Sequence, residues 1–150
     1  MKALILVDLQ KDFLPGGGLG VPQGDEVIPV ANAMQSKFDL VVASRDWHPR
    51  AHGCFAVNHE GRKPGEVTEL YGLQQILWPL HCVQNTVGAE FAPGLKTEKI
   101  AREFLKGTDP KVDSYSTFFD NARKHDTGLA NYLKEKGVTE VYLVGLATDY

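Results

Sequence analysis

The chain has 150 residues, of which 43% are hydrophobic, and it carries a formal net charge of −3 with no long block of either sign. This composition supports one buried core and one domain, and it argues against a nucleic-acid-binding protein. The first apolar run, residues 3–7, stops at Asp8 and is too short for a signal peptide, and no window is long enough to span a membrane. We therefore expect a cytoplasmic, soluble protein; the sequence does not indicate an oligomeric state.

The first part of the chain predicts one strand, one helix and a second strand. Residues 3–7 and 40–44 are continuous runs of Ala, Leu, Ile and Val, apart from a final Ser in the second. This composition is typical of strands covered on both faces in a parallel sheet. Between them a glycine-rich loop at 15–20 precedes a helix at 25–36.

The second part predicts a long insertion, two more strands and one more helix. Residues 49–93 are rich in Gly, Pro and His with little periodicity, so we expect a functional insertion over one edge of the sheet. Residues 100–105 favour a strand, although they include good helix formers. A helix at 119–136, ended by Gly137, then leads to a strand at 141–145. The fold class is α/β, with a Rossmann-like parallel sheet flanked by helices.

Polar residues follow every predicted strand. Asp8 follows the first, Asp46 and His48 follow the second, Lys106 follows the third, and a turn containing Ala147 follows the last. Ligands in open α/β sheets bind at the carboxyl ends of the strands. Each residue alone is a weak signal, but together they predict an active site at this edge.

Asp46 and His48 also suggest a metal site. In an extended chain their side chains lie on the same side of the backbone, and Pro49 keeps His48 out of the helical region. With His81 they form a carboxylate–imidazole set that suits zinc or iron(II) and leaves coordination positions open. His52 is a candidate fourth ligand or a partner of bound water.

The remaining histidines and both cysteines have simpler interpretations. We expect His59 and His125 to form local hydrogen bonds. Cys54 and Cys82 are interpreted as structural, because no export signal supports a disulfide.

Several segments together resemble one known family. They read LILVDLQKDFLPGGGL, VVASRDWHPRAHGCFA, LWPLHCVQNTVGAEF, FLKGTDPKVDSYSTFFD and VGLATDY, and they run in order from residue 4 to residue 150. This set resembles the bacterial nicotinamidases, also called pyrazinamidases, within the isochorismatase-like cysteine hydrolases.

The resemblance implies a catalytic triad of Asp8, Lys106 and a cysteine. It places that cysteine directly after Tyr150, so the nucleophile and the C-terminal part of the fold are expected to be missing from residues 1–150. It also implies a metal-binding insertion at about 46–93, an oxyanion contact from the Ala147 N–H, and a cis peptide before Ala147.

The reaction implied is hydrolysis of nicotinamide, and also pyrazinamide, to the acid and ammonia through a cysteine thioester in NAD salvage. Asp46, His48 and His81 would hold one divalent ion, with zinc favoured over iron or manganese, that positions the pyridine ring. Phe13, Trp78 and Tyr115 would line the ring pocket; for Phe13 and Trp78, core packing is the alternative. Two other functions stay open: a metal-free isochorismatase-like or carbamoyl hydrolase, and a catalytically inactive fragment that binds metal and nicotinamide.

Overall fold

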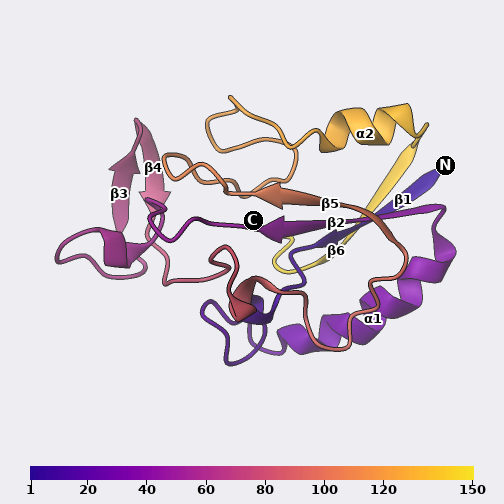
Figure 1. Ribbon diagram of the computed structural model, residues 1–150, viewed down its shortest axis with the longest axis horizontal. Helices are drawn as coiled ribbons and strands as arrows, with labels where there is room; N and C mark the ends of the chain where they lie inside the picture. Colours follow the sequence, from indigo (N-terminus) through magenta and orange to yellow (C-terminus); the bar gives the residue numbers. More distant parts are fainter.

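The computed structural model describes residues 1–150 and is built on a four-stranded parallel sheet in the order β5-β2-β1-β6 (Figure 1). The strands are β1 (Lys2–Val7), β2 (Leu40–Asp46), β5 (Ile100–Lys106) and β6 (Glu140–Gly145). All four predicted strands are confirmed, and β2 and β5 extend to Asp46 and Lys106. Because every pair is parallel, the four carboxyl ends lie at one edge of the sheet.

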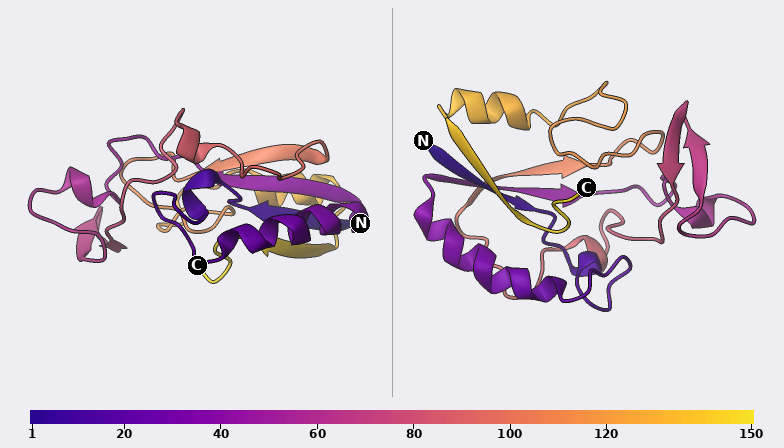
Figure 2. Two further views of the ribbon diagram at one scale, coloured as in Figure 1. Left: turned by 90° about the horizontal axis from the view of Figure 1, so that it is seen from below. Right: turned by 180° about the vertical axis from the view of Figure 1, so that it is seen from behind.

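The two α-helices cover opposite faces of this sheet (Figure 2). Helix α1 (Val27–Met34) is flanked by 3-10 turns at Gly24–Glu26 and Gln35–Lys37, close to the predicted range of 25–36. Ile28 and Ala31 of α1 pack with Leu4 and Leu6, whereas helix α2 (Leu129–Glu135) packs with Ala3 and Ile5. Alternate residues of β1 point to opposite faces, so one apolar strand serves both layers.

The helix predicted at 119–136 is much shorter than expected, since only Leu129–Glu135 is helical. In the preceding stretch, the Asp120 carboxylate accepts hydrogen bonds from the backbone N–H groups of Lys124 and His125. Asp126 accepts from the N–H of Gly128, which has a φ of 82°. These side-chain bonds offer the backbone an alternative to helical bonding.

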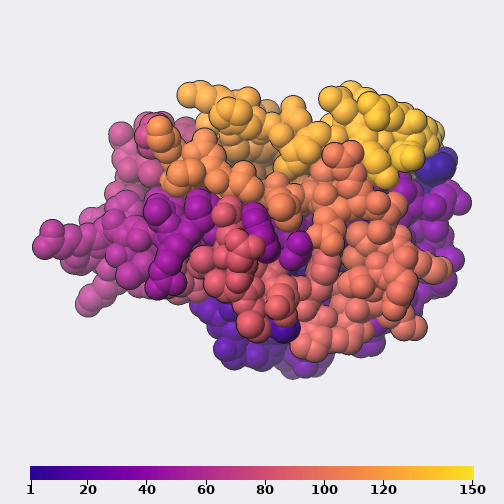
Figure 3. Space-filling model, viewed as in Figure 1, coloured from indigo at the N-terminus to yellow at the C-terminus, as the bar shows by residue number.

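The insertion lies at the carboxyl ends of the strands (Figure 1). It contains a hairpin of β3 (Val67–Leu70) and β4 (Leu73–Ile76), with 3-10 turns at Ala56–Asn58 and Val87–Ala89. Figure 1 shows the hairpin and its neighbouring loops beyond the carboxyl ends of the strands, and in Figure 3 the same magenta residues form a projection at one end of the molecule. An isolated bridge from His48 to Val83 holds the insertion against the end of β2, and one from Phe55 to Trp78 joins two of its own segments.

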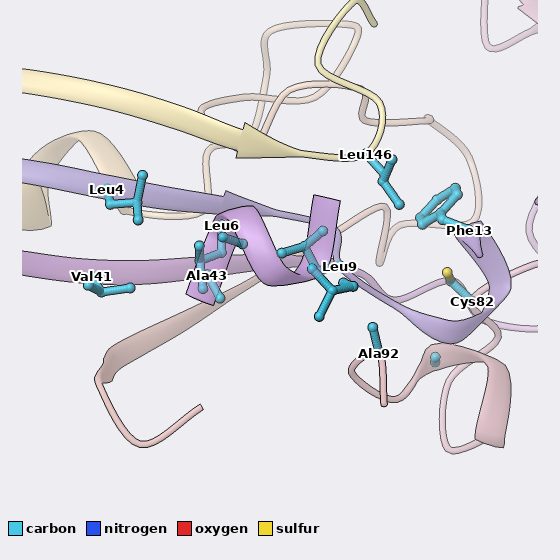
Figure 4. Packing of buried hydrophobic residues seen from close by; sticks show 12 residues of the cluster. Leu4, Leu6, Leu9, Phe13, Val41, Ala43, Cys82, Ala92 and Leu146 are labelled. Atoms are coloured by element: carbon cyan, nitrogen blue, oxygen red, sulfur yellow. The ribbon is translucent and has the colours of Figure 1, made fainter. Parts of the chain in front are cut away.

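The larger apolar cluster continues from the sheet to the site. It joins Leu4 and Leu6 under the strands to Phe13, Cys82 and Leu146 at the carboxyl end (Figure 4). A fully buried Leu or Phe side chain stabilises a fold by about 1.5–3 kcal/mol. The loops around the site are therefore packed against the same hydrophobic core as the sheet. Neither α-helix has the length and apolar composition that crossing a bilayer requires.

Candidate active site

The centre of the site is the ammonium group of Lys106, which lies between two carboxylates. Its Nζ atom lies 2.8 Å from Asp8 Oδ2, donates a hydrogen bond to Asp46 Oδ1, and lies 3.1 Å from the carbonyl oxygen of Ser114. Lys106 and both carboxylates are at most 5% exposed. The sheet register produces this contact, because Asp46 pairs with Lys106 across β2 and β5.

Ser44 fixes the orientation of Asp8. The Ser44 hydroxyl donates to Asp8 Oδ1 over 2.6 Å, and the Asp8 N–H donates to the Ser44 carbonyl over 3.2 Å. Asp8 has a φ of 46°, the left-handed region that non-glycine residues rarely adopt. The sequence analysis did not select Ser44; its one signal was a hydroxyl group within an apolar strand.

Burial and charge set the pKa values of the three groups. Burial raises the pKa of Asp8, and the Lys106 charge only partly offsets this effect. For Asp46 burial acts in the same direction, but the charge of Lys106 and the bonds to His48 and His81 hold its pKa well below the usual range. Burial lowers the pKa of Lys106, yet the two carboxylates outweigh it and raise that pKa. Asp8 is thus the carboxyl group that is better suited to hold a proton.

His48 and His81 present ring nitrogens to the other oxygen of Asp46. Their Nε2 atoms lie 3.5 and 3.6 Å from Asp46 Oδ2. Their Nδ1 atoms lie 2.9 Å from the Gly107 carbonyl and 2.8 Å from the Pro79 carbonyl, respectively. A carbonyl oxygen can only accept, so each Nδ1 donates a hydrogen bond to its carbonyl. In the neutral ring the lone pair is then on Nε2, the atom that faces Asp46 and could bind a metal ion.

Gly107 and Gln10 support this arrangement. Gly107 has a φ of 66°, and a Cβ atom there would contact the His48 ring. Gln10 is fully buried; its Nε2 donates to the Asp46 carbonyl and its Oε1 accepts from the Asp46 N–H, each over 2.8 Å. Gln10 is not among the predicted site residues, although a glutamine three residues after a buried strand was a visible signal.

Asp46, His48 and His81 fit a divalent metal ion. One ligand atom from each lies within 4.8 Å of the others, and all three residues are buried. Asp8, Asp46 and Asp113 are three buried carboxylates that line one cavity with a single ammonium group, that of Lys106. A divalent cation would balance this excess of negative charge, and the carboxylate–imidazole donor set suits zinc.

His52 is buried beside His48, with ring centroids 4.6 Å apart, but it has no free ring nitrogen. Its Nδ1 accepts from the Cys54 N–H over 3.0 Å, and its Nε2 lies 3.3 Å from the Val112 carbonyl. Burial lowers the pKa of His52 to about 4, so the ring is neutral. His52 also belongs to a second buried group, with His48, Cys54 and Asp113, whose potential ligand atoms lie within 4.8 Å of one another.

Asp113 is a further buried residue that the sequence analysis did not select. Its carboxylate accepts from Gln75 Nε2 over 3.0 Å and from the Ser114 N–H over 2.8 Å. It forms no ion pair, yet it lines the same cavity as the candidate ligands.

These groups open onto a cavity of about 340 Å³. Phe13, Trp78 and Tyr115 line it as expected, and Ala147 and Tyr150 line it as well. The rings of Trp78 and Tyr115 lie 6.5 Å apart, and Tyr150 lies 5.9 Å from Trp78. The Leu146–Ala147 peptide is cis, as the resemblance implies. The opening has the size and aromatic lining expected for a small flat ring.

The other candidate residues have local roles. His59 bonds to the Gly53 carbonyl, and His125 bonds to Asp120. Cys54 and Cys82 are free, fully buried thiols, and burial raises the pKa of both. Neither cysteine is among the residues that line the cavity.

Comparison with known families gives a match over almost the whole chain. The model of the isochorismatase domain matches residues 2–150. The chain belongs to the isochorismatase domain family. The fold class and the suggested family are therefore confirmed.

Within this family, the isochorismatase domain described here is similar to several nicotinamidases. It is 50% identical to the nicotinamidase of Escherichia coli over 153 residues, covering 99% of this chain and 71% of the relative. A structure of the yeast nicotinamidase Pnc1p bound to the inhibitor nicotinaldehyde has a TM-score of 0.92 at 36% identity, covering all of this chain and 77% of the other. The pyrazinamidase of Pyrococcus horikoshii in complex with zinc has a TM-score of 0.76 at 41% identity, covering 99% and 72%.

Proposed function

We propose that this protein hydrolyses nicotinamide to nicotinate and ammonia, and pyrazinamide likewise, as a step of NAD salvage. The observation that carries the proposal is the Asp8–Lys106–Asp46 contact beside two imidazoles in one aromatic-lined cavity. The nicotinamidases that match this chain support the same substrate.

In this proposal the nucleophile is the thiol of a cysteine that follows Tyr150, as the family resemblance implies. Cys54 and Cys82 are unsuitable, because both are buried away from the cavity and their raised pKa values disfavour the thiolate. Ala147 lines the cavity, and its N–H forms no backbone hydrogen bond. We assign this N–H as a donor to the developing oxyanion.

Asp8 acts as the acid–base group. It takes the proton of the thiol as the sulfur attacks the carboxamide carbon, and it returns that proton to the nitrogen as ammonia leaves. Water then hydrolyses the thioester and releases nicotinate. The raised pKa of Asp8 suits proton transfer, and the Lys106 charge favours both the thiolate and the ionised carboxylate.

Phe13, Trp78 and Tyr115 bind the faces and edge of the ring. Asp46, His48 and His81 would hold the divalent ion, for which zinc is our assignment because of the donor set and the zinc-bound pyrazinamidase relative. When bound, the ion supplies a Lewis-acid site that orients the pyridine nitrogen. The two free thiols fit a reducing compartment, so we place the reaction in the cytoplasm.

The test uses two substrates that differ in one atom. We expect ammonia release from nicotinamide and from benzamide, which lacks the ring nitrogen. Metal removal should raise KM for nicotinamide and leave kcat nearly unchanged, while the kinetics with benzamide stay the same.

Elemental analysis of the purified protein accompanies this assay. No ammonia release would contradict the proposed reaction. Turnover of nicotinamide by a metal-free protein with unchanged KM would contradict the positioning role and favour the metal-free hydrolase.

A further inference from the structure

Asp12 connects three segments around the cavity without contacting the cavity itself. Its Oδ2 accepts a hydrogen bond from the Cys82 N–H over 2.7 Å, and its Oδ1 accepts from the Gly18 N–H over 3.1 Å. Its carboxylate also packs against Gly88, where a Cβ atom would overlap it. Asp12 forms no ion pair, and the hydrogen bonds that its carboxylate accepts both come from backbone N–H groups.

The first of these bonds holds the peptide that follows His81. Cys82 has a φ of 46°, a conformation that non-glycine residues adopt only when their surroundings hold them there. Both polar groups of its backbone are bonded: the N–H to Asp12, and the carbonyl to the N–H of His48 over 3.0 Å. Asp12 therefore holds the N–H of Cys82, the residue that directly follows His81 and whose carbonyl accepts from the His48 N–H.

The second bond holds the glycine-rich loop, which supplies another part of the cavity lining. Gly18 lies so close to the Leu80 carbonyl that a Cβ atom would contact it. The next N–H, that of Leu19, donates to the Asp12 carbonyl over 2.9 Å, and Leu19 lines the cavity. The glycine-rich loop and the His81 segment are thus held by the same side chain. Phe13 directly follows Asp12 in the chain, and the centroid of its ring lies 5.6 Å from that of the His81 ring.

We infer that Asp12 is a positioning residue that sets the place of His81, and through it the affinity of the Asp46–His48–His81 site for a divalent cation. The inference rests on the metal site of the proposed function. Groups that orient metal ligands from behind typically change metal affinity by about 10–100-fold when they are replaced.

The test compares Asp12→Asn with Asp39→Asn. The amide of asparagine has the size of the carboxylate but presents an NH2 group to one of the two N–H donors. Asp39 is a matched control, because its Oδ2 accepts from the Lys2 N–H over 2.8 Å at the other end of the sheet. Metal-free protein is titrated with cobalt(II), and binding is followed by the visible absorption of the complex.

We expect Asp12→Asn to weaken cobalt affinity by about 10–100-fold and Asp39→Asn to leave it within twofold of the wild type. Amide hydrogen exchange on the metal-free proteins should show faster exchange at Cys82 and Gly18 in Asp12→Asn only. Asp12→Ala, which removes both acceptors, should weaken affinity further. If the alanine variant does not fold, the asparagine variant alone decides.

Three outcomes overturn the inference. Equal cobalt affinity of Asp12→Asn and the wild type would show that Asp12 only stabilises its loop, and the metal site of the proposed function would still stand. Unchanged exchange at Cys82 would remove the mechanism by which Asp12 acts. A wild-type protein that binds no cobalt would contradict both this inference and the proposed metal site.

Discussion

Asp46 and Lys106 lie opposite each other in the register of two neighbouring strands, whereas His81 and Trp78 lie in an insertion without long regular elements. The strand-end groups are placed by the backbone hydrogen bonds of the sheet. The loop groups are placed by hydrogen bonds of individual side chains. The Asp12 carboxylate accepts from the Cys82 N–H, and the Gln75 amide donates to the Asp113 carboxylate and to the Ile76 carbonyl. Half of the site is therefore determined by topology, and the other half depends on a few individual side chains.

The two halves should respond differently to substitution. Removing one charged side chain among Asp8, Asp46 and Lys106 leaves the others buried without an ion-pair partner. Removing one polar side chain from the loops breaks one or two hydrogen bonds.

The largest effect is expected for Lys106→Ala. It leaves the buried carboxylates of Asp8 and Asp46 without their cation, and breaking a buried ion pair typically costs about 3–5 kcal/mol. We expect a loss of that size in the free energy of urea unfolding and a fall in turnover of about 10²–10⁴-fold. Metal content should be retained, because the three candidate ligands remain.

The exposed Lys99, replaced by Ala, is the control for this substitution. Turnover at the wild-type rate in Lys106→Ala would refute the catalytic assignment of Lys106. A stability equal to that of the control would refute the view that the strand-end charges depend on one another.

A smaller effect is expected for Gln75→Ala in the hairpin. The substitution removes the donor to Asp113 and leaves a buried carboxylate with one bond fewer, which costs about 1–3 kcal/mol. Gln74 on the same strand is exposed, and its replacement by Ala should stay within about 0.5 kcal/mol of the wild type. Urea unfolding measures both variants. Equal stability of the two would mean that the hairpin does not hold Asp113.

The smallest effect is expected for Asp120→Asn and concerns pH. Burial acts to raise the pKa of Asp120, but hydrogen bonds from the Lys124 N–H and from His125 outweigh it and lower that pKa. A lowered folded-state pKa stabilises the fold above the unfolded-state value of about 3.9, and this stabilisation is lost as the pH falls through the folded-state pKa.

The wild type should therefore exceed Asp120→Asn in stability by about 1–2 kcal/mol near neutral pH, and the difference should shrink below about pH 4. Thermal unfolding from pH 3 to pH 7 measures this difference. A difference that stays constant down to pH 3 would contradict the role of the ionised carboxylate.

The sequence by itself was sufficient for the four parallel strands and for the residues at their ends. Apolar runs of β-branched residues and leucine predict buried strands, and parallel strands bring their carboxyl ends together. Asp8, Asp46 and Lys106 follow from this logic alone. His81 came from the carboxylate–imidazole ligand set, and the family resemblance added the residues that no spacing rule connects, namely Phe13, Trp78 and Tyr115.

Only the tertiary structure decided which polar groups support the site. Ser44, Gln10 and Asp113 act through contacts with residues more than thirty positions away, and no local pattern encodes such pairs. The same holds for His52, whose spacing suits a ligand but whose two ring nitrogens are bonded to backbone. It also holds for the short α2, because Asp120 bonds to nearby N–H groups that a longer helix would use. The hydrophobic periodicity of a sequence predicts which residues are buried, whereas the hydrogen-bond partners of a side chain depend on the tertiary fold.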